Sequence, residues 1–370
     1  MIETLSNWSN SLLFAAIVVY AVAFVCFTFD IALRGSKQQK ASAATSAAGA
    51  TARKRELVGA AVGADAAGMV SAAEGSADAV TRSAGISSSI HGTDRGVFAT
   101  RAKGEGTASV AREEFRDKNA TKLLPYAMIA TAIGFVLHLA ATVLLGIAAG
   151  RVPWSNMYEF SMTATLIVTG VFLAVQAWQD LRFLGSFVTG LVTLSLGIAS
   201  LGFYVEVVPL QPALQSWWLV VHVFVASLST GLLALGCGLS ILQLLQQRRQ
   251  LKVRGGAAAG GPLTALPGAV RLEDLAFRLN VIGFIFWTFT LVAGSIWAEA
   301  AWGRYWGWDT KEVWTLIIWI VYAGYLHARA THGWRGSPSA WLSIIGFGTV
   351  LFNFGIVNVF FKGLHAYSGL

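Results

Sequence analysis

Long apolar runs alternate with short polar segments along most of the 370-residue chain. A helix needs about 20 apolar residues to cross a hydrocarbon core roughly 30 Å thick, and eight of the runs reach that length. We therefore predict eight transmembrane helices, at about residues 11–33, 124–147, 158–178, 184–204, 217–244, 279–298, 314–333 and 340–361. The predicted fold is an all-α, polytopic membrane helix bundle, which excludes a soluble globular enzyme.

One long segment interrupts this pattern. Residues 35–122 are rich in Ala, Gly, Ser and Thr, contain no proline and have few large apolar side chains. Such a stretch cannot bury enough apolar surface to offset the entropy lost on ordering. We therefore expect an N-terminal transmembrane helix (1–34), a low-complexity, disordered cytoplasmic insert (35–122) in which Ala-rich helix can form transiently, and a membrane-embedded domain (123–370).

The distribution of charge predicts the orientation of the bundle. Only 12% of the residues are charged, and the formal net charge is +8. If the N-terminus is outside, the segments on the inside contain 23 of the 27 Lys and Arg residues, as the positive-inside rule expects. Both termini are then outside. Because the basic residues lie between membrane segments, we expect no nucleic-acid partner.

Tryptophan is concentrated in one predicted outside loop, which connects the sixth and seventh helices. The segment 297–314 reads WAEAAWGRYWGWDTKEVW, and six of the 14 tryptophans of the chain lie between positions 297 and 319. An aromatic belt at the membrane interface explains one or two tryptophans at each helix end. The larger number here favours a platform for a flat ligand, with interfacial anchoring as the alternative.

The histidines add possible metal ligands. His222 is near the outer end of the fifth helix and His365 follows the eighth, so both can face the tryptophan-rich loop. His327 is on the order of 20 Å deeper, counted at 1.5 Å per helical residue, and His138 is near mid-depth. Axial ligation of haem iron takes a neutral imidazole from each face, so this arrangement predicts a haem site. In that site, Arg304 or Lys311 could pair with the haem propionates.

Three sequence motifs resemble those of a known family. The run WGRYWGWDTKEVW, followed by YLHAR and a terminal GLHAY, resembles the tryptophan-rich WWD haem-handling family. Within that family, the chain is most similar to the CcsA (ResC) proteins of system II cytochrome c biogenesis. The segment VPWSNMYEF at 152–160 is similar to a further family motif of the form SN-x-YE. The resemblance covers the first helix and residues from about 124 onward, and the insert has no counterpart.

The resemblance implies roles for individual residues. His222 and His365 match the two external histidines proposed to bind haem iron, and His327 matches the transmembrane haem ligand of the family. The second transmembrane histidine is generally attributed to the partner subunit, so His138 is either a local ligand or a core residue. The WWD motif itself maps to Trp302, Trp306, Trp308 and Asp309.

The resemblance also implies a function. The chain would export haem b across the cytoplasmic membrane of a bacterium and present it, on the extracytoplasmic face, to the CxxCH motif of apocytochrome c. It would act as one subunit of a cytochrome c synthetase, with a CcsB/ResB-type membrane subunit and thiol-reducing partners. No residue has the pattern of a catalytic nucleophile. The alternatives are a b-type haem electron carrier and a haem-free transporter or structural subunit.

Overall fold

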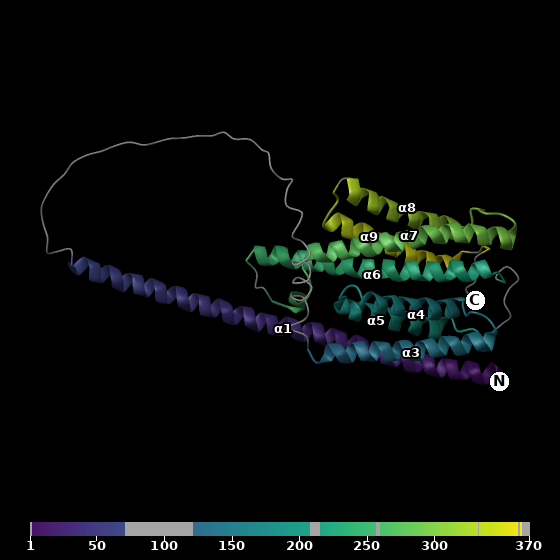
Figure 1. Ribbon diagram of the computed structural model, residues 1–370, viewed down its shortest axis with the longest axis horizontal. Helices are drawn as coiled ribbons and strands as arrows, with labels where there is room; N and C mark the ends of the chain where they lie inside the picture. The colour runs from purple at the N-terminus through teal and green to yellow at the C-terminus, as the bar shows by residue number, and fades with distance from the viewer. Residues whose placement is uncertain are drawn as a thin grey trace. The chain divides into compact units, whose positions relative to one another are not determined.

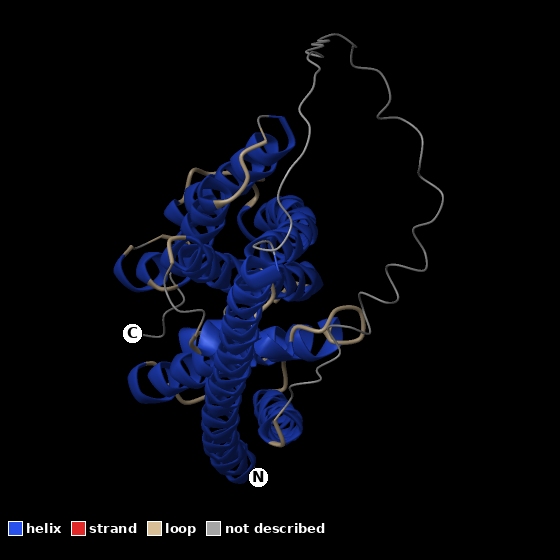
Figure 2. Ribbon diagram, turned by 90° about the vertical axis from the view of Figure 1, so that its left-hand side faces the viewer, coloured by secondary structure: helices blue, strands red, loops and turns tan. Residues whose placement is uncertain are grey.

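The structure is a computed structural model that describes residues 2–70, 121–207, 215–256, 260–331, 333–361 and 363–364. These residues form helices and connecting loops only, as Figure 2 shows. Within the described residues, eight helices are long and apolar enough to cross a membrane, which confirms the predicted all-α, multi-pass fold. The elements are α1 (Ile2–Val70), α3 (Leu123–Ala149), α4 (Met157–Val175), η1 (Arg182–Leu184), α5 (Gly185–Gly202), α6 (Trp217–Arg254), η3 (Pro262–Ala265), α7 (Ala269–Trp302), α8 (Thr310–Thr331), α9 (Ser337–Phe354) and α10 (Ile356–Phe360).

The first helix is longer than its apolar run. It continues through residue 70, so residues 39–70 are helical, where we expected a disordered segment with only transient Ala-rich helix. Their high alanine content explains the difference, because alanine has the strongest intrinsic preference for the α-helix. The protein divides into two compact units, residues 1–38 with 121–370 and residues 39–120. The rest of the predicted insert, residues 71–120, lies outside the described residues.

The membrane unit contains two groups of helices that share α6 and α7. One core is formed by α1, α3, α4, α5, α6 and α7 around large side chains such as Tyr20, Phe27 and Phe172. The other is formed by α6, α7, α8 and α9 around Trp287 and Tyr322. In Figure 1 the helices of this unit run roughly parallel or antiparallel to one another. This arrangement places α6 and α7 beside both groups.

The paired helices α6 and α7 extend past α3, α4, α5, α8 and α9 at the end where their connection lies (Figure 1). They contain 38 and 34 residues, well above the roughly 20 that cross a hydrocarbon core. Gln246 on α6 donates hydrogen bonds to the carbonyl oxygens of Leu266 and Pro267. These bonds hold the connection between α6 and α7 against α6. We call this end of the bundle the inner end and the opposite end the outer end, after the predicted topology.

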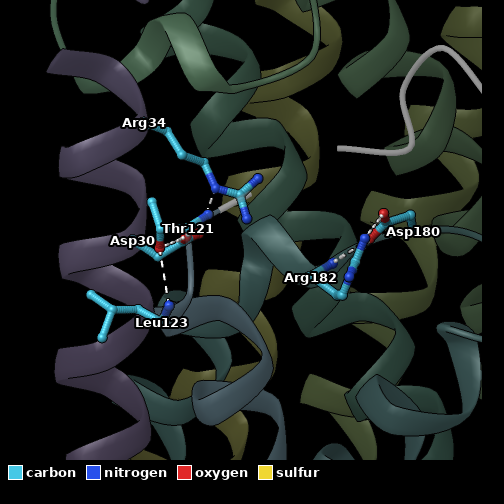
Figure 3. A network of polar contacts seen from close by, with 6 residues as sticks. All are labelled: Asp30, Arg34, Thr121, Leu123, Asp180 and Arg182. Carbon is cyan, nitrogen blue, oxygen red and sulfur yellow. Dashed lines mark hydrogen bonds and ion pairs between the residues drawn. The ribbon is translucent and has the colours of Figure 1, made fainter. Parts of the chain in front are cut away.

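A polar network joins α1 to α3 at the inner end (Figure 3). The buried carboxylate of Asp30 accepts hydrogen bonds from the Thr121 hydroxyl at 2.5 Å and the Thr121 N–H at 3.3 Å, and it pairs with Arg34. Nearby, partial burial raises the pKa of Asp180, but the hydrogen bonds and charge of Arg182 outweigh that effect and lower it. The network holds the end of the membrane part of α1 against the start of α3.

Candidate functional site

A cavity of about 260 Å³ lies between α4, α5, α6, α7, α8 and α9 in the outer half of the bundle. Most of its surface is apolar, and several of the lining side chains are aromatic: Trp154, Phe160, Trp287, Trp297, Trp306 and Phe347. A concave, mainly apolar pocket with a few polar groups is the usual form of a small-molecule site. This cavity is therefore the candidate site.

His222 lines the cavity from the second turn of α6. Its Nδ1 is 3.0 Å from the main-chain oxygen of Thr290 on α7. A carbonyl oxygen can only accept, so this hydrogen bond requires the proton on Nδ1 and places the lone pair of the neutral ring on Nε2. A metal-binding histidine commonly makes such a bond with its other ring nitrogen, which fixes the tautomer and the orientation of the ring.

Two residues of α7 complete the surroundings of this imidazole. The ring stacks on Trp297, with ring centroids 6.0 Å apart and planes 18° from parallel. Gly294 leaves room for it, because a Cβ atom at position 294 would lie 2.8 Å from Cε1 of His222. The environment of His222 therefore comes from α7, about 70 residues further along the chain.

The tryptophans of the WWD motif occupy different places. Trp306 lines the cavity, and Trp308 is 72% exposed. Trp302 packs against Trp297 with centroids 4.7 Å apart, and it is not among the residues that line the cavity. Trp308 has a φ of 58°, a left-handed conformation that is unusual for a bulky residue and often marks a functional loop. Of the tryptophans in the segment 297–314, Trp297 and Trp306 therefore line the cavity.

Asp309 starts α8 as a helix cap. Its Oδ2 accepts from the N–H of Lys311 at 3.3 Å, and Glu312 Oε2 accepts from the N–H of Asp309 at 3.1 Å. This reciprocal arrangement is a capping box, and the spacing Asp-x-x-Glu in the sequence could have predicted it. Glu312 Oε2 also accepts from the N–H of Gly307 at 2.8 Å, so one carboxylate organises the loop and the helix start.

Asp309 also contacts the C-terminal segment. Its Oδ1 accepts a hydrogen bond from the main-chain N–H of Leu364 at 3.2 Å. His365, the next residue in the chain, lies outside the described residues, so its pairing with His222 stays a prediction. Leu364, the last described residue before His365, is therefore hydrogen-bonded to Asp309 of the WWD motif.

The other two predicted ligands are not part of the cavity wall. His327 is exposed on α8, on the same face as Ile320 and Gly324. His138 is fully buried, and its ring contacts that of Tyr20 on α1 edge-to-face at 6.0 Å. In the part of the chain that the structure describes, no three His, Cys, Asp or Glu side chains are grouped to hold a metal ion. The structure does not bring His222, His327 and His138 together.

The SN-x-YE segment has a structural role beside the same cavity. The Asn156 side chain accepts from the N–H of Glu159 at 2.9 Å and caps α4. Glu159 is buried and pairs with Arg151 through two hydrogen bonds of 2.7 and 3.0 Å. Asn156 also lines the cavity, as does Phe160 one turn later. The motif therefore fixes the start of a helix that forms one cavity wall.

Comparisons with known proteins agree with the sequence motifs. Residues 154–365 match the family described as cytochrome C assembly protein. The CcsA cytochrome c biogenesis protein of Trieres chinensis is 35% identical over 250 residues, which is 60% of this chain and 80% of that protein. Those of Synechococcus elongatus and Porphyra purpurea are 33% and 32% identical, over 65% of this chain and 87% and 88% of their own lengths.

Proposed function

Because this chain belongs to the cytochrome c assembly protein family and acts in cytochrome c biogenesis, we propose that it exports haem b and presents it to apocytochrome c. Haem crosses the cytoplasmic membrane of a bacterium and is held at the extracytoplasmic face. The acceptor is the CxxCH motif of apocytochrome c. The chain works with a CcsB/ResB-type membrane subunit as a cytochrome c synthetase, and other partners keep the acceptor thiols reduced.

The environment of His222 is the observation that carries this proposal. The imidazole lines an apolar, tryptophan-walled cavity, and its Nδ1 is directed to the Thr290 carbonyl. The tautomer that makes this bond is the one that binds iron through Nε2. A planar macrocycle suits such a cavity, because the lining aromatic rings can pack against its faces.

His365 is proposed as the second axial ligand at this site. Leu364, directly before it, donates to Asp309, and the same aspartate caps α8 beside Trp308. Two imidazoles, one on each face, satisfy the axial positions of haem iron. Under this proposal, the Asp309 carboxylate keeps the C-terminal segment close to the cavity and does not itself contact iron.

His327 is proposed to bind haem on its way across the membrane. It is exposed on a membrane-spanning helix, and ionisable side chains in such helices often mark the path of a transported ligand. A second ligand for this step would come from the partner subunit. His138 remains an alternative, although it is buried against Tyr20 instead.

The proposed reaction depends on holding the haem vinyl groups close to the acceptor thiols, more than on a side chain that activates either group. Each acceptor thiol adds across a vinyl group of haem: the sulfur bonds to one carbon and the proton ends on the other, so no oxidant or reductant is consumed. Holding the vinyl groups within reach of the thiols converts a bimolecular encounter into an effectively unimolecular one. His222, His365 and the tryptophan wall would hold haem in that position.

Purification of the complex with haem bound tests the ligand assignment. We expect His222→Gly and His365→Gly to change the absorption spectrum of outer-site haem and to reduce the yield of cytochrome c, because each removes an axial ligand. His91→Gly, in the predicted insert, is the matched control and leaves both unchanged. An unaltered spectrum together with a normal yield in either ligand variant rejects the assignment.

A second measurement separates the proposed function from its alternatives. Haem is counted per purified chain, and its transfer to an added apocytochrome with reduced thiols is followed. A synthetase subunit transfers the haem, whereas a b-type electron carrier keeps it and changes redox state with quinol. A colourless protein would indicate a haem-free transporter or structural subunit.

A further inference from the structure

The cavity is polar where α8 meets α9 and α10. Lys311 and Glu312, in the first turn of α8, line it there together with Asn353 and Asn358. His222 lines the same cavity from α6. A ligand in the cavity would therefore meet an imidazole on α6 and an ammonium group on α8.

The Lys311 ammonium has only neutral partners at contact distance. Its Nζ donates to the main-chain oxygen of Asn353 at 3.0 Å and to Oδ1 of Asn358 at 2.6 Å. None of the ion pairs found among the described residues includes Lys311. An ammonium group has three N–H donors, so the two bonds leave one available to a further acceptor. A partly buried cation without a contacting counter-charge is unfavourable, and a ligand carboxylate would offset that cost.

The nearby carboxylates are engaged elsewhere. Glu312 Oε2 accepts from the N–H groups of Gly307 and Asp309, and its Oε1 is 3.8 Å from the Arg304 guanidinium. The two oxygens of Asp309 accept from the N–H groups of Lys311 and Leu364. These carboxylates hold the loop and the helix start, and neither contacts the Lys311 ammonium.

We propose that Lys311 binds a carboxylate of the cavity ligand, which for haem is a propionate. This inference rests on the proposed function and adds how the ligand is oriented. Of the two basic residues considered from the sequence, Arg304 is one-third exposed, pairs with Glu312 and does not line the cavity. The vinyl groups of haem b lie across the macrocycle from the propionates, so a propionate at Lys311 directs them away from α8. Lys311 is thus a positioning residue for the vinyl groups.

Binding of haem and of its dimethyl ester tests the proposal. The full-length chain in detergent micelles is titrated with each compound, and binding is followed by Soret absorbance. We expect the wild-type chain to prefer the free diacid by at least about tenfold, the value of one charge-assisted hydrogen bond. Lys311→Met abolishes the preference, so that the diacid binds no more tightly than the ester, whereas Lys311→Arg keeps it. Arg304→Met, the matched control, also keeps it.

The outcomes separate this inference from the function on which it rests. If the wild-type chain binds both compounds equally, or if Lys311→Met weakens both to the same extent, Lys311 is not a carboxylate anchor although haem binding stands. If the wild-type chain binds neither compound, both the inference and the proposed function are wrong.

Discussion

At the residue scale, the site depends on how closely α7 approaches His222. Thr290, Gly294 and Trp297 follow one another at intervals of four and three residues, so they share one face of α7. On that face, Thr290 provides a hydrogen-bond acceptor for the imidazole and Trp297 an aromatic ring against which it stacks. Gly294, which has no side chain, leaves the space that the imidazole occupies. The position of His222 is consequently sensitive to any atom added at residue 294.

Gly294→Ala is expected to weaken haem binding at the outer site by about tenfold, because overpacking of this kind costs about 1–3 kcal/mol. The new Cβ atom would lie 2.8 Å from Cε1 of His222 and displace the ring. Haem titration of the purified chain measures the change. Gly197→Ala on α5 is the control, since a Cβ atom there meets nothing within 4 Å. Equal affinities for the two variants would show that close packing at Gly294 does not position the ligand.

At the element scale, three helices that border the cavity begin with side-chain caps at the outer end: Asn156 caps α4, Ser216 caps α6 and Asp309 caps α8. In α4 and α8 a glutamate follows the cap residue three positions later. In α8 the glutamate returns a hydrogen bond to the cap residue, and in α4 it pairs with Arg151 instead. Caps satisfy main-chain N–H groups that would otherwise lack partners, so they determine where each helix begins.

Glu312→Ala is expected to reduce stability by about 0.5–2 kcal/mol, the usual effect of losing a helix cap. It removes the acceptor shared by the N–H groups of Gly307 and Asp309, so the loop at 303–309 should also become more sensitive to protease. Thermal unfolding and limited proteolysis measure the two effects. Glu312→Gln is the matched variant, because glutamine serves in the same capping position. If the alanine and glutamine variants behave alike, the capping interaction does not stabilise this loop.

At the scale of the whole molecule, the chain leaves the membrane unit at residue 38, within α1, and re-enters it at Thr121. Asp30, two turns before residue 38, is hydrogen-bonded to Thr121, where the unit resumes (Figure 3). This contact joins α1 to the start of α3. The contacts within the membrane unit are therefore compatible with a much shorter connection.

Deletion of residues 41–110 is expected to leave cytochrome c maturation near normal, because the Asp30–Thr121 contact and the cavity are both outside the deleted segment. Haem-stained cytochrome c is compared between strains that produce equal amounts of the full-length and shortened chains. Complete loss of maturation at normal protein levels would give the segment an essential role.

The spans could be predicted from the sequence because each apolar run must be long enough to cross the hydrocarbon core. The extensions of α1, α6 and α7 were missed, since helix outside the membrane has no such apolar signal. Outside the membrane, these extensions are stabilised by intrinsic helix preference and by packing between α6 and α7, instead of by burial in lipid. The capping box at Asp309 was readable from its spacing, but its contact with Leu364 was not.

The amino-acid sequence alone determined the membrane class, the number of spans and the motifs that indicate haem handling, because these depend on local composition and spacing. Tertiary packing decided which side chains share the cavity. It brings His222 to Thr290 and directs Lys311, instead of Arg304, to the cavity wall. It also leaves His327 exposed and places His138 against Tyr20. The physical reason is that the direction of a side chain toward a neighbour depends on how distant helices pack, and neighbouring positions in the sequence do not encode that packing.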